Sequence, residues 1–148
     1  MEYKDAVQNL SPCGIDCGRC ADNENGEIRQ VSLRLLELLG QYERLARLKA
    51  EKNPAFENYA EFTDILRSFS RAACSGCRGG HVLCPLAACR AKTCQREKRI
   101  DFCFQCDEYP CDEQFSGPLR DRWIHINDRM KEIGAAAYYR EQLEKPRY

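Results

Sequence analysis

Closely spaced cysteines are the feature that most restricts how this chain can fold. Eleven of its 148 residues are cysteines. Two cysteines separated by two residues can point their sulfurs at one position, and a tetrahedral thiolate metal site needs that convergence. Three such pairs occur in the sequence, namely Cys17/Cys20, Cys74/Cys77 and Cys103/Cys106. The spacing therefore predicts a metal-binding protein whose cysteine-rich segments are ordered by ligation.

Ten cysteines are the candidate metal ligands, enough for two sites of four cysteines each. They are Cys13, Cys17, Cys20, Cys74, Cys77, Cys89, Cys94, Cys103, Cys106 and Cys111. We expect Cys74 and Cys77 to share one site with a pair drawn from the four cysteines between 89 and 106. The run 13–20 forms the other cluster, completed by Cys111. The spacing alone leaves this partition open.

Three further side chains bear on these sites. Cys84 does not lie at a spacing typical of a metal-binding turn, so we expect it to be a spare thiol. His81 lies close to the Cys74/Cys77 pair, and imidazole is a common zinc ligand. His125 falls within a predicted amphipathic helix, which favours a surface position.

Zinc is the metal that the sequence favours, and an iron–sulfur cluster is the alternative. Zinc sites are often built from paired cysteines on separate segments, which this chain supplies. Iron–sulfur clusters use the same thiolates, and the C-x3-C-x2-C run has the spacing found in enzymes that split S-adenosylmethionine. Those enzymes use a large α/β barrel, whereas this chain shows no alternation of strands and helices. We therefore expect zinc.

The bulk composition predicts a single-domain protein with no net charge. Lysine plus arginine and aspartate plus glutamate number 23 each, so no overall charge draws the chain to nucleic acid or to an anionic membrane. No segment approaches the ~18 apolar residues of a membrane span, and the first residues lack a signal pattern. These features predict a cytoplasmic protein, in which clustered cysteines bind metal more often than they form disulfides.

Hydrophobic periodicity predicts helices on both sides of the cysteine-rich middle. Apolar residues recur in steps of three and four from Ile28 to Leu48, and a second helix with an aromatic face begins at Pro54. A third apolar stripe runs from Leu119 to Ile133, followed by Gly134 as a helix stop. We expect these stripes to pack in the core.

The chain is thus predicted to be a single mainly α-helical domain, residues 1–148, with an irregular metal-binding segment. Its parts are the first cysteine cluster (13–20), a helical hairpin (26–71), a cysteine-rich segment (73–116) and C-terminal helices (117–145). The cysteine-rich segment shows no sustained period, so any β structure should be limited to short hairpins at the metal-binding turns.

The order of these motifs resembles that of a prokaryotic cysteine-rich family, domain of unknown function 3795. The matching segments are Cys13-Gly14-Ile15-Asp16-Cys17-Gly18-Arg19-Cys20, Cys74-Ser75-Gly76-Cys77, and the stretch from Cys89 through Cys94 to Phe102-Cys103-Phe104-Gln105-Cys106-Asp107-Glu108-Tyr109-Pro110-Cys111. The resemblance implies a metal-binding protein and implies no particular activity. Cys84 departs from the family pattern.

Two classes of function fit these observations. The first is a non-catalytic binding or adaptor module, because four cysteines close a zinc site against substrate and no hydrolytic motif or phosphate loop occurs. Its partner would be another protein. A basic stretch between Arg90 and Arg99 would suit nucleic acid, but we expect these charges to offset metal-bound thiolates. The second class is an iron–sulfur or thiol redox protein. The sequence does not set the oligomeric state.

Overall fold

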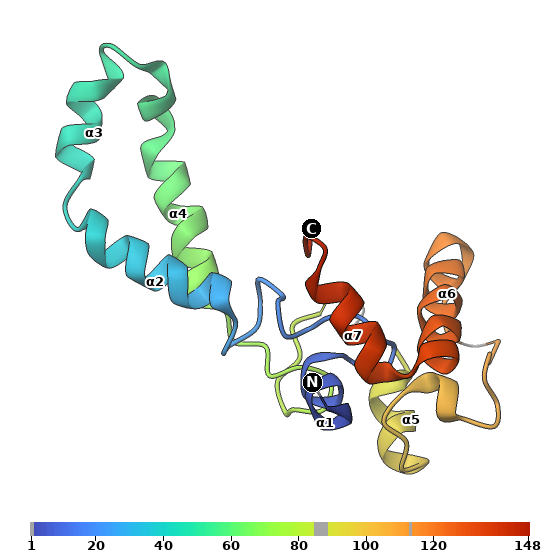
Figure 1. Cartoon of the computed structure of the whole chain (residues 1–148). Helices are drawn as coiled ribbons and strands as arrows, with labels where there is room; N and C mark the ends of the chain where they lie inside the picture. The colour runs from blue at the N-terminus through green and yellow to red at the C-terminus, as the bar shows by residue number, and fades with distance from the viewer. Residues whose placement is uncertain (1, 85–88, 113) are drawn as a thin grey trace.

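The chain folds into a helical body from which a helical arm projects, as Figure 1 shows. The computed structural model describes residues 2–84, 89–112 and 114–148. The body contains α1 (Tyr3–Asn9), α5 (Ala91–Glu97), η2 (Cys103–Gln105), α6 (Gly117–Ile133) and α7 (Ala135–Leu143). The arm contains α2 (Glu27–Leu39), α3 (Glu43–Ala50), η1 (Pro54–Asn58) and α4 (Tyr59–Ser70).

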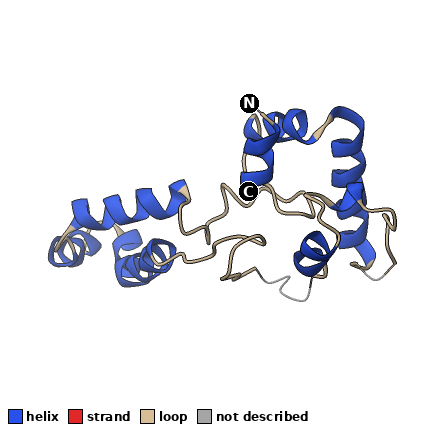
Figure 2. Ribbon diagram, turned by 90° about the horizontal axis from the view of Figure 1, so that it is seen from below, coloured by secondary structure: helices blue, strands red, loops and turns tan. Residues whose placement is uncertain are grey.

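The mainly α-helical fold predicted from the sequence is confirmed. Helices and loops make up the described part of the chain, and Figure 2 shows no strand there. The extended pairing among these residues consists of two isolated bridges, Leu10 with Asp16 and Asn23 with Cys74. Both bridges lie beside cysteine-containing turns. Among the described residues, β structure therefore occurs only next to these turns.

The body is built around the buried face of α6. Trp123, Ile126 and Met130 follow the predicted apolar stripe and are almost fully buried. Met130 and Ile126 pack with Phe102 of the η2 approach and Leu10 at the end of α1. Gly134 ends α6 with a positive φ of 84°, a conformation that glycine adopts without steric cost, and α7 follows directly. The predicted stop at Gly134 is therefore where the helix ends.

Cysteines form part of the hydrophobic interior rather than a separate layer. Cys13 is 6% exposed and belongs to a cluster with Ala91 of α5 and Trp123 of α6. Half-buried Cys89, Cys103 and Cys111 pack against the same cluster. The first cysteine loop, the middle segment and α6 thus share one interior, although they lie far apart in the sequence.

A single buried amide connects these three segments. Asn127 of α6 is fully buried. Its Nδ2 donates to the carbonyl oxygen of Cys13 at 3.0 Å and to that of Trp123 at 3.0 Å, and its Oδ1 accepts from the backbone N–H of Phe104 at 3.1 Å. Because the side chain satisfies backbone groups that are shielded from water, it fixes both cysteine loops relative to α6.

The arm differs from the expected hairpin of two helices. The predicted first helix is divided at Gly40, whose φ of 51° ends α2, and α3 begins only at Glu43. Part of the apolar stripe is also not in a core, since Val31 is 57% and Leu38 66% exposed. The short helix α1 precedes the first cysteine cluster and was not among the predicted helices.

The role of Asn127 leads to a stability prediction. Replacing Asn127 with Leu removes partners from buried backbone groups of Cys13 and Phe104, each of which costs ~1–3 kcal/mol when unsatisfied. We expect N127L to lower the free energy of unfolding by about 2–4 kcal/mol, measured by urea denaturation. Asn58 is exposed and its side chain makes no hydrogen bond in the described structure, so N58L should change stability by less than ~0.5 kcal/mol. Equal effects of the two substitutions would contradict the role of Asn127.

Candidate metal centre

Four of the predicted ligands line one small cavity in the body. Cys94 of α5, Cys103 of η2, Cys106 and Cys111 surround a space of about 30 Å³. Trp123, Tyr109 and Ala91 form its apolar wall. A space of this size accommodates about one water-sized sphere, which is the scale of a single ion with its sulfur ligands drawn inward.

The local chain path explains why these four cysteines line the same cavity. Arg99, directly after α5, has a φ of 52°, and this left-handed residue turns the chain back toward η2. The amide of Cys103 then donates to the carbonyl oxygen of Pro12 at 2.9 Å, which holds η2 against the first cysteine loop. Two successive turns follow. The amide of Cys106 donates to the carbonyl oxygen of Cys103, and the amide of Tyr109 donates to that of Cys106, both at 3.0 Å.

Positive charge lies beside this cavity. Lys98 Nζ is 3.3 Å from Cys106 Sγ and 2.7 Å from a carboxylate oxygen of Glu108. The pKa of Lys98 is raised, first by its hydrogen bond to Glu108 and further by Cys106. Arg120 donates to the carbonyl oxygen of Cys111 at 2.6 Å and places its guanidinium over the Trp123 ring. Both cations reduce the cost of holding thiolates together.

The thiols that face this interior resist ionisation. Burial raises the pKa of Cys103 to about 12, and the negative charge of Cys13, Cys89 and Cys111 adds to the effect. Burial also raises the pKa of Cys111, with further contributions from Cys94 and Cys106. A thiolate here needs a cation nearby, and a metal ion supplies more positive charge than any side chain.

A second group of sulfurs interacts electrostatically with Cys13. Burial raises the pKa of Cys17 and of Cys77 to about 12. After burial, Cys77 and Cys13 are the next causes for Cys17, while Cys13, Cys89 and Cys84 are the next for Cys77. The Cys13 sulfur is 3.0 Å from Ser11 Oγ, and Gln114 Nε2 donates to Cys89 Sγ at 2.8 Å. These five cysteines are therefore close enough to interact electrostatically.

Cys20 and Cys74 lie at the edge of the second group, where the arm joins the body. The amide of Cys74 donates to the carbonyl oxygen of Asp22 at 2.8 Å, and that of Glu24 donates to the carbonyl oxygen of Cys74 at 3.1 Å. These bonds pair the strand-like ends of the two cysteine segments. Both sulfurs are half-buried.

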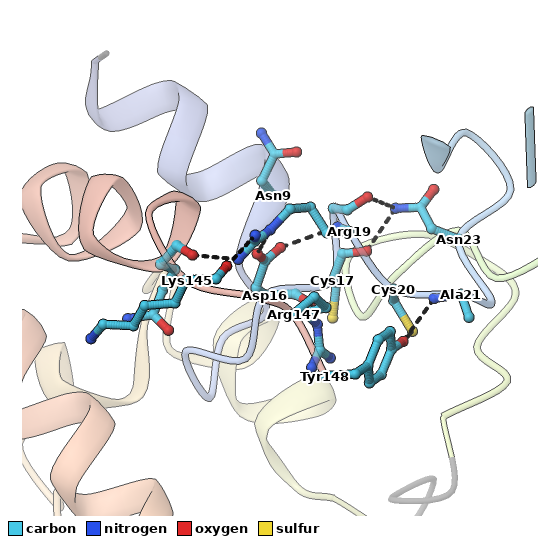
Figure 3. Close-up of polar contacts among 12 residues, drawn as sticks. Asn9, Asp16, Cys17, Arg19, Cys20, Ala21, Asn23, Lys145, Arg147 and Tyr148 are labelled. Carbon is cyan, nitrogen blue, oxygen red and sulfur yellow. Dashed lines mark hydrogen bonds and ion pairs between the residues drawn. The ribbon is translucent and has the colours of Figure 1, made fainter. Parts of the chain in front are cut away.

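The C-terminal residues cover the first cysteine loop, as Figure 3 shows. Arg19 forms a 2.6 Å ion pair with the buried carboxylate of Asp16 and donates to the carbonyl oxygens of Gln142 and Lys145. Arg147 Nε donates to the carbonyl oxygen of Asp16 at 2.8 Å. These contacts hold the end of the chain against the loop that carries Cys17 and Cys20.

Tyr148 reaches the sulfur at the edge of this loop. Its hydroxyl accepts from the amide of Ala21 at 2.8 Å and lies 3.7 Å from Cys20 Sγ (Figure 3). The Arg147 guanidinium lies over the Tyr148 ring, 4.7 Å from its centroid. The tail thus places an aromatic hydroxyl, held by a neighbouring cation, beside Cys20.

The two histidines occupy different environments. His81 Nδ1 is 3.0 Å from the carbonyl oxygen of Ala73. The Ser75 hydroxyl donates to the carbonyl oxygen of His81 and accepts from the amide of the same residue. Metal-binding histidines commonly use one ring nitrogen for such a carbonyl contact. His125 is exposed on α6, as expected for a surface position.

The surroundings of Cys111 and Cys77 bear on the expected partition of the sulfurs. Cys111 lines the cavity with Cys94 and also packs against the buried cluster that contains Cys13, and the charges of Cys13 and Cys89 both contribute to the raised pKa of Cys77. Among residues 2–84, 89–112 and 114–148, no group of three or more His, Cys, Asp or Glu side chains is arranged so that it could hold a metal ion. Metal ligation therefore requires the sulfurs to move closer together, and the ligand assignments stay predictions.

The comparisons with known proteins identify the family. A family model described as "Protein of unknown function (DUF3795)" matches residues 9–116, well over half of the chain. The chain belongs to this family, in agreement with the resemblance of its cysteine motifs. No curated protein and no solved structure matches.

The contacts of Tyr148 generate a prediction on backbone protection. Replacing Tyr148 with Phe removes only the hydroxyl that accepts from the Ala21 amide. We expect Y148F to speed hydrogen exchange at Ala21 by ~5-fold or more, since losing one hydrogen bond is worth ~1 kcal/mol. NMR exchange measurements check this, and Tyr42→Phe in the arm serves as the control. Unchanged exchange at Ala21 would show that the tail does not protect the loop.

Proposed function

We propose that the chain is a zinc-binding protein in which cysteine sites are structural and hold together a non-catalytic binding module. The observation that supports this most directly is that Cys94, Cys103, Cys106 and Cys111 all line one small cavity. Four thiolates are the donor set of closed structural zinc sites. A closed site leaves no position for a reactive water, so recognition rather than hydrolysis is the expected task.

The surroundings of the cavity fit a metal–thiolate site in their chemistry. Lys98 and Arg120 partly offset the excess negative charge of four thiolates around a divalent ion. Trp123 and Tyr109 give the cavity an apolar wall, and the Tyr109 hydroxyl donates to the carbonyl oxygen of Ile124 and to the carboxylate of Asp128. The second group, centred on Cys13, Cys17 and Cys77, is the candidate for another site.

The proposal includes a protein partner. No helix in the described part of the chain is long and apolar enough to cross a membrane. The basic stretch around α5 is committed to the body, since Lys98 contacts Cys106 and Arg96 donates to the carbonyl oxygen of Gly79. These contacts favour the interpretation that the basic side chains compensate negative charge in the body, rather than the interpretation that they bind nucleic acid. The proposed compartment is the cytoplasm.

Metal content of matched variants tests the cavity assignment. Replacing Cys106 with Ser removes a soft donor from the cavity, so we expect C106S to bind about one zinc ion per chain fewer than the wild type. Elemental analysis of the purified proteins measures this. His125→Gln is the control, because His125 is exposed on α6 and does not line the cavity.

Two results would contradict the proposal. One is equal zinc content in C106S and the wild type. The other is iron with acid-labile sulfide and a brown colour in protein purified without air, which would establish the iron–sulfur alternative.

Proton release provides an independent check. Zinc binds the thiolate form of cysteine. In the metal-free fold, burial raises the pKa of Cys103 to about 12, so its thiol stays protonated at ordinary pH. Zinc affinity should therefore fall as pH falls, and binding should still release at least one proton at pH ~9.5, above the ordinary thiol pKa of ~8.5. Calorimetry in buffers of different ionisation enthalpy counts these protons. No proton release at that pH would show that Cys103 is not a ligand.

A further inference from the structure

Trp123 places an unpaired hydrogen-bond donor in the wall of the cysteine cavity. The side chain is 2% exposed and lines the cavity together with Cys103. Its indole Nε1–H is shielded from solvent and has no hydrogen-bond acceptor among residues 2–84, 89–112 and 114–148. Burying a polar group without a partner costs free energy, so such groups are rare in folded proteins. The unpaired indole N–H therefore calls for a reason connected with the cavity.

The Cys103 sulfur is the cavity group with which the indole interacts. Burial raises the pKa of the Cys103 thiol, whereas its contact with the Trp123 side chain acts to lower that pKa. The contact falls short of hydrogen-bond geometry, so the N–H lies beside the sulfur without being satisfied by it. A neutral thiol is a weak acceptor, and an ionised group is a much stronger one. The indole is therefore placed beside a group that becomes a good acceptor only when it loses its proton.

Hydrogen bonds join the backbone of Trp123 to the backbone beside Cys103. Asn127 Nδ2 donates to the carbonyl oxygen of Trp123 at 3.0 Å, and Asn127 Oδ1 accepts from the amide of Phe104 at 3.1 Å. The amide of Cys103 is itself held by the carbonyl oxygen of Pro12 at 2.9 Å. Because these bonds fix both main-chain positions, Trp123 and Cys103 stay adjacent when other sulfurs move toward a metal.

Aromatic and cationic neighbours fix the plane of the indole. The rings of Tyr109 and Phe115 meet it edge to face, with centroid distances of 5.1 Å and 6.0 Å. The Arg120 guanidinium lies over the ring, 5.8 Å from its centroid. A cation is attracted to the face of an indole and draws electron density from it, which makes the N–H a better donor. The indole can therefore donate without rotating into a new position.

Polar side chains accompany other sulfurs of the body in the same way. In the described part of the chain, four cysteines each have a polar side chain within hydrogen-bond distance of the sulfur. These pairs are Cys13 with Ser11, Cys20 with Tyr148, Cys89 with Gln114 and Cys106 with Lys98. Beside Cys103, the corresponding place is taken by the indole of Trp123.

We propose that the Trp123 indole N–H donates a hydrogen bond to the thiolate of Cys103 when this sulfur is a metal ligand. The inference rests on the proposed function, because a thiolate in this interior needs a bound cation. Trp123 is a positioning residue: the hydrogen bond orients the Cys103 sulfur and offsets part of its negative charge. Trp123 thus strengthens zinc binding without touching the ion.

NMR of the cadmium-loaded chain tests the hydrogen bond directly. The chain has one tryptophan, so its indole N–H gives a single signal of its kind in the nitrogen–proton spectrum. In the full-length protein loaded with a spin-half cadmium isotope, the indole proton should show scalar coupling to cadmium, because such coupling passes through a hydrogen bond to a ligating sulfur. Cross-relaxation between the indole proton and the β protons of Cys103 identifies the sulfur. The measurement uses the wild-type chain, so it does not depend on whether a variant folds.

Zinc affinity of two variants separates the N–H from the packing of the ring. Trp123→Phe removes the donor and keeps an aromatic side chain, so we expect W123F to bind zinc at least ~10-fold more weakly than the wild type. Competition with a chromophoric chelator measures the affinity. Phe115→Leu is the matched control, because it removes an aromatic contact with the indole and leaves the N–H in place. F115L should reduce zinc affinity far less than W123F.

The outcomes distinguish this inference from the proposed function. Cadmium bound by the chain without coupling to the indole proton, or with cross-relaxation to a different cysteine, would overturn the inference and leave the proposed zinc site standing. Equal losses of zinc affinity in W123F and F115L would also overturn it, because packing alone would then explain the loss. A chain that binds neither metal would overturn the proposed function and the inference together.

Discussion

The side-chain amide of Asn127 connects the parts of the body that carry the sulfur atoms. It bonds the carbonyl oxygen of Cys13, the amide of Phe104 beside Cys103, and the backbone of its own helix α6. Without this link the first cysteine loop and the η2 segment would have to satisfy buried backbone groups elsewhere. The geometry around the cavity of Cys94, Cys103, Cys106 and Cys111 therefore depends on one fully buried polar side chain.

Burial of cysteine side chains inside the body makes their ionisation unfavourable. The raised pKa values of Cys17, Cys77 and Cys103 mean that neighbouring thiols favour the neutral form in the metal-free chain. A metal ion reverses this preference because it binds thiolates and supplies compensating charge. Lys98 and Arg120 are too few to do so alone. The proposal of zinc sites follows from this imbalance as much as from the cysteine spacing.

The sequence allowed the helical class, the α6 stripe and its stop at Gly134 to be predicted, because these depend on local periodicity and on one glycine conformation. It also pointed to the family through its cysteine order. The grouping of the sulfurs could not be predicted, since it depends on long-range contacts such as the bond from Cys103 to Pro12. The tail contacts of Arg19 and Tyr148 likewise join residues more than 120 positions apart, and no local pattern encodes them. In the arm, apolar periodicity identified the helices, but the exposed residues among them follow from how α2 and α4 cross.

The most direct test of this account is X-ray absorption at the zinc edge of the purified, full-length protein. The account predicts a first shell of four sulfur atoms at ~2.3 Å, without oxygen or nitrogen, because closed structural sites in this chain would be made of cysteine alone. A mixed shell with a water oxygen would instead indicate an open, catalytic site. The absence of zinc, with iron in its place, would contradict the central claim.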